Sequence, residues 1–319
     1  MRIRSLLPWL VLFGACGCDL FTSDYIRAFE MDGDVQTIEF SPDGALLMVG
    51  AGRSRIWTVR DWRQIYDSGP REMTEGVAFS PDGRRILVYD QEYDQRCLRV
   101  LGIDSEAILE VSLVSAGDLR HFSISADSTY AAVANSDCLE IRQLDSLKRV
   151  DRLGEAVDLV QFALDGLLLA AGLRENGEVF LRYELEEDQL REVSYVARSV
   201  HCEANDISFS ADGSVFMLVG EGVGESRLWS YPAFEHLWTL DEWSVDNVAF
   251  SPDGEWIAVG GRQKGLRLVR AQDGKRIVDL DDPDPDSKMC VAASPDGKYI
   301  VSSYRNWVRI WDVQSILSR

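Results

Sequence analysis

A five-residue motif that returns at near-constant spacing constrains the fold of this 319-residue chain more than any other feature. "FSPDG" occurs three times, and four degenerate copies accompany it. Successive motif aspartates are 38 to 47 residues apart; they are Asp43, Asp82, Asp127, Asp165, Asp212, Asp253 and Asp296. A period near forty residues is typical of architectures in which each unit packs on the next. Seven such units fill most of the chain and leave no room for a second domain.

Each repeat unit has the pattern of four short strands joined by tight turns. A strand that ends in Phe precedes the motif and an apolar strand follows it, as in "VQTIEF" and "LLMVGA". A third strand such as "SRIWTV" and a more polar fourth such as "RQIYDS" complete the unit. Within the motif, Pro presets the second turn position, Asp bonds the local backbone and Gly adopts the left-handed conformation. The motif is therefore expected to be a structural turn in an all-β array.

Four strands in about forty residues, together with "RIWD" at Arg309–Asp312, resemble the tryptophan-aspartate (WD) repeat family. The resemblance covers Tyr25 to Val313. It implies an all-β fold, a seven-bladed β-propeller of four-stranded blades. A propeller of the periplasmic Tol type, which also uses "SPDG" turns, is a close structural alternative.

The chain departs from the WD pattern in most units. The Trp-Asp pair is complete only at Trp311–Asp312, Trp57 and Trp229 stand without the Asp, and the Gly-His pair is missing. The resemblance places the family's loop aspartate only at Asp137. We therefore expect side-chain packing to replace most of the internal hydrogen-bond network that the family uses.

The two ends of the repeat region predict how the ring closes. The last unit has only three strand-like runs, and "YIRAFE" at Tyr25–Glu30 stands before the first unit without a partner. In propellers an N-terminal segment commonly supplies the outer strand of the last blade, which removes an exposed strand edge. We expect Tyr25–Glu30 to play this part in a single domain that spans residues 25–319.

The first residues have the pattern of an export signal. Arg2 and Arg4 precede a short apolar run, Leu6 to Phe13, which small residues and cysteine follow. This is the order of a secretory signal peptide, and the run is shorter than the ~20 apolar residues of a membrane span. "FGAC" also resembles the lipobox of bacterial lipoproteins, in which a lipidated cysteine becomes the mature N-terminus.

The lipobox resemblance implies lipidation at Cys16, with Cys18 as the alternative. It divides the N-terminus into a signal peptide at residues 1–15 and a lipid-anchored linker at residues 16–24. The chain is then expected to be exported and held at the periplasmic face of the outer or inner membrane. Nine residues from Cys16 to Tyr25 span at most ~30 Å. We therefore expect the side of the propeller that carries the "SPDG" turns to lie near the membrane.

The net charge and the scarcity of reactive motifs limit the functions that can be expected of this chain. The formal net charge is −20. Such a surface repels phosphate backbones, so nucleic acid is not an expected partner. The three histidines fall in different units without ligand spacing, and the acidic stretch Asp279–Lys288 lacks the Gly and terminal Glu of a calcium loop. We expect no metal, no cofactor and no catalytic residue.

The four cysteines beyond the N-terminus show no Cys-x-x-Cys spacing; they are Cys97, Cys138, Cys202 and Cys290. Sequence alone leaves their disulfide connectivity open. Cys97 and Cys138 open similar stretches, "CLRVLGI" and "CLEIRQL", and so take equivalent places in successive units. We expect these two to be buried and to pack as small apolar residues.

Arginines follow the turn Gly by eight or nine residues in several units, and they are the candidate partner-binding residues: Arg53, Arg174, Arg262 and Arg305. Units six, seven and one are neighbours in a closed ring, so three of these arginines are expected to form a basic arc. Arginine suits carboxylates and recurs at interface hot spots. The alternative is that each pairs with Asp or Glu of its own surface. Trp243 is a candidate aromatic companion, or else packs between blades.

These features predict a lipid-anchored propeller that acts as a protein–protein interaction or scaffolding module of the bacterial cell envelope. Its expected partners are envelope proteins or peptides. The alternative is a propeller enzyme, a lactonase-like hydrolase or an oxidoreductase, with a site at the central channel. Convergence of carboxylates and histidines at the channel mouth would discriminate between the two, because fold does not fix function.

Overall fold

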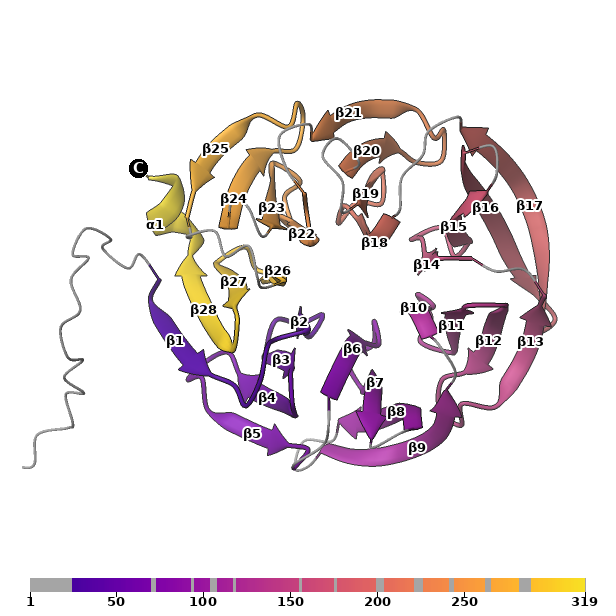
Figure 1. Ribbon diagram of the computed structural model, residues 1–319, viewed down its shortest axis with the longest axis horizontal. Helices are drawn as coiled ribbons and strands as arrows, with labels where there is room; N and C mark the ends of the chain where they lie inside the picture. The colour runs from indigo at the N-terminus through magenta and orange to yellow at the C-terminus, as the bar shows by residue number, and fades with distance from the viewer. Residues whose placement is uncertain are drawn as a thin grey trace, which may run out of the picture.

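Seven four-stranded antiparallel sheets stand side by side in a closed ring (Figure 1). The structure is a computed structural model that describes residues 25–69, 73–92, 95–103, 108–116, 119–154, 157–174, 177–198, 204–220, 226–240, 244–261, 265–280 and 288–318. The predicted signal peptide and linker, Cys16 and Cys18 included, lie outside these residues. The predicted all-β seven-bladed propeller is confirmed.

The first four blades run in chain order from the innermost to the outermost strand. Blade 1 consists of β2 (Thr37–Phe40), β3 (Leu46–Gly50), β4 (Ser54–Thr58) and β5 (Gln64–Asp67). Blade 2 consists of β6 (Met73–Phe79), β7 (Arg85–Glu92), β8 (Gln95–Ile103) and β9 (Ile108–Ala116). Blade 3 consists of β10 (Leu119–Ile124), β11 (Tyr130–Asn135), β12 (Leu139–Gln143) and β13 (Arg149–Leu153). Blade 4 consists of β14 (Leu159–Phe162), β15 (Leu168–Arg174), β16 (Gly177–Glu186) and β17 (Gln189–Arg198).

The remaining blades follow the same order, except that the last takes its outer strand from the N-terminus. Blade 5 consists of β18 (Ala204–Phe209), β19 (Val215–Gly220), β20 (Ser226–Ser230) and β21 (His236–Leu240). Blade 6 consists of β22 (Asn247–Phe250), β23 (Trp256–Gly261), β24 (Gly265–Arg270) and β25 (Arg276–Asp279). Blade 7 consists of β26 (Val291–Ala293), β27 (Tyr299–Tyr304), β28 (Trp307–Asp312) and β1 (Arg27–Glu30). A short helix, α1 (Val313–Leu317), follows β28.

The repeated motif forms the same tight turn between the first two strands of each blade. In blade 1 the Gly44 N–H donates to Ser41 O at 2.8 Å, and the Ser41 hydroxyl donates to Asp43 Oδ1 at 2.6 Å. The Ser41 and Ala45 donors hold the pKa of Asp43 below its usual range. Gly44 has φ 69°, and Ser128 takes this position in blade 3 with φ 59°. The structural role predicted for the motif is confirmed.

The N-terminal strand closes the ring. β1 pairs antiparallel with β28, with Arg27 opposite Ile310 and Glu30 opposite Trp307. The sheet order β1-β28-β27-β26 is the one expected for closure. This pairing covers the edge that the last three strands of the chain would otherwise expose.

Strand direction gives the disc two distinct sides. The turn side carries the seven tight turns, and every outer strand begins there. The mouth side carries the hairpin turns between second and third strands and the first residues of the innermost strands. Tyr299 follows directly on the turn of blade 7 and pairs with Asp312 at the end of β28. Because β1 runs antiparallel to β28, the chain enters the propeller from the turn side.

Apolar side chains from adjacent blades interlock to form the core. Between blades 7 and 1, a cluster of buried residues includes Phe40, Trp57, Val301 and Ile310. Phe29 of the closing strand packs against Trp57, with ring centroids 4.5 Å apart and ring planes tilted by 31°. Equivalent clusters fill the other interfaces, so stability comes mainly from packing of blade on blade.

Two residues of the WD pattern show what remains of the family's hydrogen bonds. In blade 7 the Trp311 indole Nε1–H donates to Ser302 Oγ at 2.9 Å. Asp137 instead forms a surface ion pair with Arg152 at 3.1 Å. Cys97 and Cys138 are buried free thiols, as expected, and so is Cys290, whereas Cys202 lies outside the described residues. Burial raises the pKa of the Cys290 thiol.

Candidate functional site

The central channel is a cavity of about 780 Å³ lined by the innermost strands of all seven blades. Prolines of the tight turns, such as Pro81 and Pro252, line its turn-side end. Its other end, at the first residues of the innermost strands, is lined by polar and charged side chains: Glu75, Arg120, Asp206, Asp246 and Lys288. We call this end the polar mouth. The channel is therefore chemically different at its two ends.

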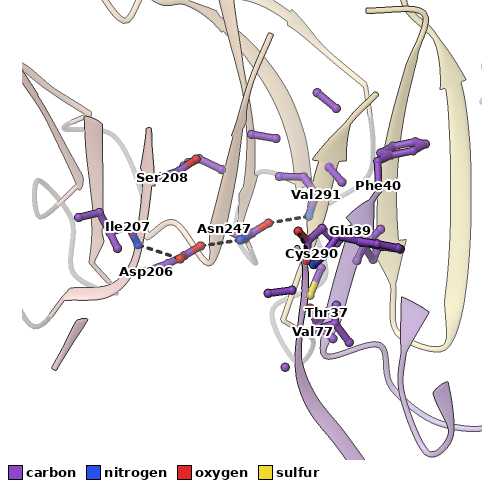
Figure 2. A pocket seen from close by; sticks show the side chains of 18 of the residues that line it. Thr37, Glu39, Phe40, Val77, Asp206, Ile207, Ser208, Asn247, Cys290 and Val291 are labelled. Atoms are coloured by element: carbon purple, nitrogen blue, oxygen red, sulfur yellow. Dashed lines mark hydrogen bonds between the residues drawn. The ribbon is translucent and has the colours of Figure 1, made fainter. Parts of the chain in front are cut away.

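A row of hydrogen bonds runs along the channel wall across three blades (Figure 2). Asp206 accepts from the Ile207 N–H at 2.8 Å and from the Asn247 side-chain amide at 2.6 Å. Asn247 Oδ1 in turn accepts from the Val291 N–H at 2.9 Å. The Asp206 carboxylate and the Asn247 amide thus tie the innermost strands of blades 5, 6 and 7 together. They also satisfy polar groups on strand edges that face the channel.

One histidine meets a carboxylate in this wall. His121 Nδ1 lies 2.9 Å from Val160 O, so this nitrogen carries the proton, and Nε2 lies 3.5 Å from Asp206 Oδ1. The other two histidines do not join it: His236 bonds Thr239 on an outer strand, and His201 lies outside the described residues. The channel wall therefore brings together a single His–Asp pair among the described residues, and both partners already bond neighbouring blades.

Glu39 lies in the channel wall between blades 1 and 2. Its Oε1 accepts from the Phe79 N–H at 3.2 Å. Ser123 does the same for the Phe162 N–H at 3.0 Å between blades 3 and 4. Glu39 differs from Ser123 because it can ionise. Burial raises the pKa of Glu39 to about 8, although the bond from Phe79 acts in the opposite direction. Although its side chain borders the channel, Glu39 is thus mostly protonated at neutral pH.

Glu39→Gln should stabilise the protein above pH 8 and change little near pH 5. Between the ordinary value of 4.5 and about 8, the folded chain keeps a proton that the unfolded chain releases. The parent's free energy of unfolding therefore falls as pH rises through this window. Glutamine keeps an oxygen for the Phe79 N–H and does not titrate. Urea unfolding across this pH range measures the difference between the two proteins.

The matched control is Ser123→Ala, which removes the equivalent bond between blades 3 and 4 without changing a titrating group. Its destabilisation should stay constant across the same pH range. A Glu39→Gln effect that is equally constant would contradict the raised pKa of Glu39.

The candidate partner-binding arginines are placed only in part. Arg53, in the β3–β4 turn, pairs with Asp32 and lies 3.5 Å from Asp67. Arg305 lies in the β27–β28 turn of the neighbouring blade 7. Its backbone carbonyl oxygen accepts a hydrogen bond from the Val35 N–H. Both turns lie on the mouth side, as expected. The Arg53 guanidinium thus meets carboxylates of its own surface, which was the alternative to a free arc.

For three of the candidate partner-binding residues, the side chain lies outside the described part of the chain. Arg262 and Trp243 lie outside the described residues. Arg174 ends β15, and its side chain lies outside the described part of the chain. Whether these residues contact a partner stays a prediction.

A second set of arginines, on the third strands, was missed by the sequence analysis. They occupy one register position in five blades: Arg55, Arg99, Arg227, Arg267 and Arg309. The signal was present in the repeats "SRIW", "LRVL", "SRLW", "LRLV" and "VRIW". Each arginine extends from a strand inside a blade, so these cations act within the propeller wall.

Arg99, the third-strand arginine of blade 2, forms a buried ion pair. Arg99 Nε lies 2.8 Å from Asp90 Oδ2, and the two side chains are 3% and 2% exposed. Asp90 Oδ1 also accepts from the Thr74 hydroxyl at 2.7 Å, and Thr74 Oγ1 lies 2.6 Å from Ser54 Oγ of blade 1. The charge pair and two hydroxyls thus form a polar link between blades 1 and 2.

Within the described residues, no group of three or more His, Cys, Asp or Glu side chains is placed to hold a metal ion. Over the same part of the chain, no helix is long and apolar enough to cross a membrane.

Comparison with known proteins identifies the repeat type. The family model described as "WD domain, G-beta repeat" (WD40) matches residues 234–269 and 280–312. These two segments are similar to WD40 repeats, which supports the resemblance seen in the sequence. Among solved structures, the chain is similar to one titled "Kuenenia stuttgartiensis Hydrazine Synthase". The TM-score is 0.71 at 16% identity, over 92% of this chain and 99% of that one. At this identity the likeness shows the fold alone.

Proposed function

We propose that this protein is a lipid-anchored interaction scaffold of the bacterial cell envelope. Export and lipidation at Cys16, or at Cys18, follow from the N-terminal sequence pattern. WD40 repeats in a seven-bladed propeller are typical of protein-interaction scaffolds, which supports binding of a protein or peptide partner. The polar mouth and its surrounding turns present the surface that the partner contacts.

Entry of the chain from the turn side is the observation that carries this proposal. β1 begins at the end of β28 that lies beside the turn of blade 7. The nine-residue tether at residues 16–24 therefore leads to the turn side. The mouth side, with Arg53 and Arg305, points away from the tether and stays free for a partner.

Partner binding at the mouth side would exchange one set of ion pairs for another. Arg53 already pairs with Asp32, whose side chain is half exposed. A partner carboxylate that displaces Asp32 keeps the arginine paired and orders a surface loop. Such an exchange contributes more to specificity than to affinity.

An enzyme with a site in the channel is the alternative, and the contact between His121 and Asp206 is the observation that favours it. Both groups also bond neighbouring blades, and Asp206 accepts from Ile207 and Asn247 at normal hydrogen-bond distances. A catalytic base would have to give up a bond that joins two blades. This cost favours the scaffold.

In-cell crosslinking followed by mass spectrometry tests the proposal. We expect the wild-type chain to capture an envelope partner that the triple variant Arg53→Glu, Arg262→Glu, Arg305→Glu loses. The variant must keep the wild-type melting temperature, because Arg53→Glu places a third carboxylate beside Asp32 and Asp67. Charge reversal turns attraction for carboxylates into repulsion, which lowers the association rate most.

The matched control reverses three cations of the turn side: Arg63, Arg270 and Lys298. Each is exposed and paired with a nearby aspartate, and the change in net charge is the same. Capture by this control but not by the mouth-side variant would support the proposed surface. Equal capture by both variants would place the interface elsewhere. No capture by the wild type would favour the enzyme, and hydrolase assays would follow.

A further inference from the structure

The outer strands share a feature that the repeat motif does not reveal. Where the third and outer strands pair, a register shift leaves one residue of the outer strand unpaired in blades 1 to 6. That residue is aliphatic in every case: Ile65, Val111, Val150, Val193, Leu237 and Ile277. In blade 7, Ile26 takes the equivalent place, directly before Arg27. At such a bulge the side chains of Ile65, Val193, Leu237 and Ile277 are exposed at the rim of the disc, whereas Val150 packs against the core.

Three of these residues lie on adjacent blades, and we call them, together with the helix residue described below, the apolar arc. Ile277, Ile26 and Ile65 belong to blades 6, 7 and 1 and are 40%, 54% and 41% exposed. All three stand at the beginning of an outer strand, and therefore near the turn side. Figure 1 shows β25, α1, β1 and β5 following one another along this part of the rim.

The C-terminal helix adds to the same arc. Val313 and Ile316 of α1 are buried in a cluster against which Tyr25 and Val278 pack. Tyr25 and Val278 are the chain neighbours of Ile26 and Ile277. Leu317, on the outer face of α1, is 46% exposed. Blades 6, 7 and 1 and the C-terminal helix thus each expose one large aliphatic side chain on the same part of the rim.

We propose that this arc, Ile26, Ile65, Ile277 and Leu317, rests on the lipid bilayer and holds the propeller tilted on its rim. The inference depends on the proposed lipid anchor. The 24 residues that precede the described part of the chain join it at Tyr25, beside Ile26. A lipidated Cys16 therefore brings the arc of blades 6, 7 and 1 to the membrane first.

Charge supports this orientation. The turn and outer strand of blade 6 carry Arg270, Lys275 and Arg276, which are well exposed and which Asp273 and Asp279 only partly neutralise. On the far side of the ring, the β16–β17 turn of blade 4 exposes four acids, Glu184, Glu186, Glu187 and Asp188. An anionic lipid surface repels such a turn and tolerates the near-neutral arc. The acidic turn thus points away from the membrane.

Site-specific fluorescence on the full-length lipidated protein tests the proposal. Single cysteines replace Ile26 and Ile277 in the arc. Two comparison sites are Val193, at the equivalent bulge of blade 4 and 49% exposed, and Leu164, on the turn side of blade 4 and 64% exposed. Each chain also carries Cys202→Ser, is labelled with a fluorescent maleimide, and is reconstituted into phosphatidylethanolamine–phosphatidylglycerol vesicles that contain nitroxide-labelled lipid. The signal of the labelled parent chain is subtracted.

We expect several-fold stronger quenching at Ile26→Cys and Ile277→Cys than at Val193→Cys and Leu164→Cys. Equal quenching at Leu164→Cys would mean that the whole turn side lies flat on the bilayer, which overturns the tilted contact. If the protein floats with the vesicles but the labels in the arc are not quenched, the membrane contact of the arc is overturned and the lipid anchor is supported. Failure to float would overturn both. Leu317→Cys gives a second reading of the arc if one substitution disturbs folding.

Discussion

Arg99→Leu should lower the free energy of unfolding by ~3–5 kcal/mol, the range for breaking a buried ion pair from one side. The variant leaves the Asp90 carboxylate in a site that is 2% exposed, without its 2.8 Å cationic partner. The hydroxyl of Thr74 still donates to Asp90, but one neutral bond does not compensate a buried charge. Urea unfolding at neutral pH measures the loss.

The equivalent substitution in blade 6 is the control. Arg267 occupies the same register position and pairs with Asp279 Oδ1 at 2.5 Å, but the Asp279 side chain is 37% exposed. Water can solvate Asp279 when Arg267→Leu removes its partner, so the loss should be clearly smaller. Equal losses in the two blades would mean that packing of the arginine stem, and not the buried charge, decides stability.

The double variant Arg99→Met, Asp90→Leu tests whether Arg99→Leu loses stability because it leaves the Asp90 charge buried without a partner. Apolar residues of similar volume often replace a buried pair at little or no cost. We expect this double variant to recover most of the stability that Arg99→Leu loses. Failure to recover would show that the link through Thr74 and Ser54 to blade 1 requires the carboxylate itself.

The architecture could be predicted from the sequence because its signals are local. Each tight turn is specified within six residues, as the Ser41–Leu46 turn shows, and the period of the turns counts the blades. The closing strand could be predicted because the last unit lacked a fourth strand while Tyr25–Glu30 lacked a partner. Both inferences need only the order of elements along the chain.

The channel wall could not be predicted because its contacts join residues from different blades. Asn247 meets Asp206 and Val291, about forty residues away on either side. His121 reaches Asp206 across 85 positions. Which side chains meet depends on the register of the inner strands and on the curvature of the ring. The sequence of a single repeat unit indicates neither of these.

The third-strand arginines and the aliphatic bulge residues are an intermediate case. Both sets recur at fixed offsets, so aligning the units would have revealed them. Their roles would still have been hidden, because identical offsets lead to different environments. Arg99 is buried against Asp90, whereas Arg309 lies over the ring of Tyr304 at 4.5 Å.

Deletion of Tyr25–Glu30 should lower the melting temperature by on the order of 10 °C or more, or abolish cooperative unfolding. The deletion removes the ladder of β1 on β28 and exposes the edge of β28. It also removes the Phe29 ring from Trp57 and the Tyr25 ring from Trp311, at centroid distances of 4.5 and 5.8 Å. Blades 7 and 1 lose part of their shared core, so the ring can open. Calorimetry of the shortened chain measures the effect.

A circular permutation distinguishes pairing from simple covalent closure. In the permuted chain, residues 25–30 follow residue 318 through a flexible linker, and the new N-terminus precedes Met31. Tyr25 already packs against the cluster that contains Val313 and Ile316, so the linker has little distance to span. If β1 stabilises the ring by pairing with β28 and by burying Phe29, the permuted chain regains the parental melting temperature. If the permuted chain stays as unstable as the deletion variant, pairing of β1 with β28 is not sufficient. The closed ring then also requires the covalent connection between β1 and blade 1.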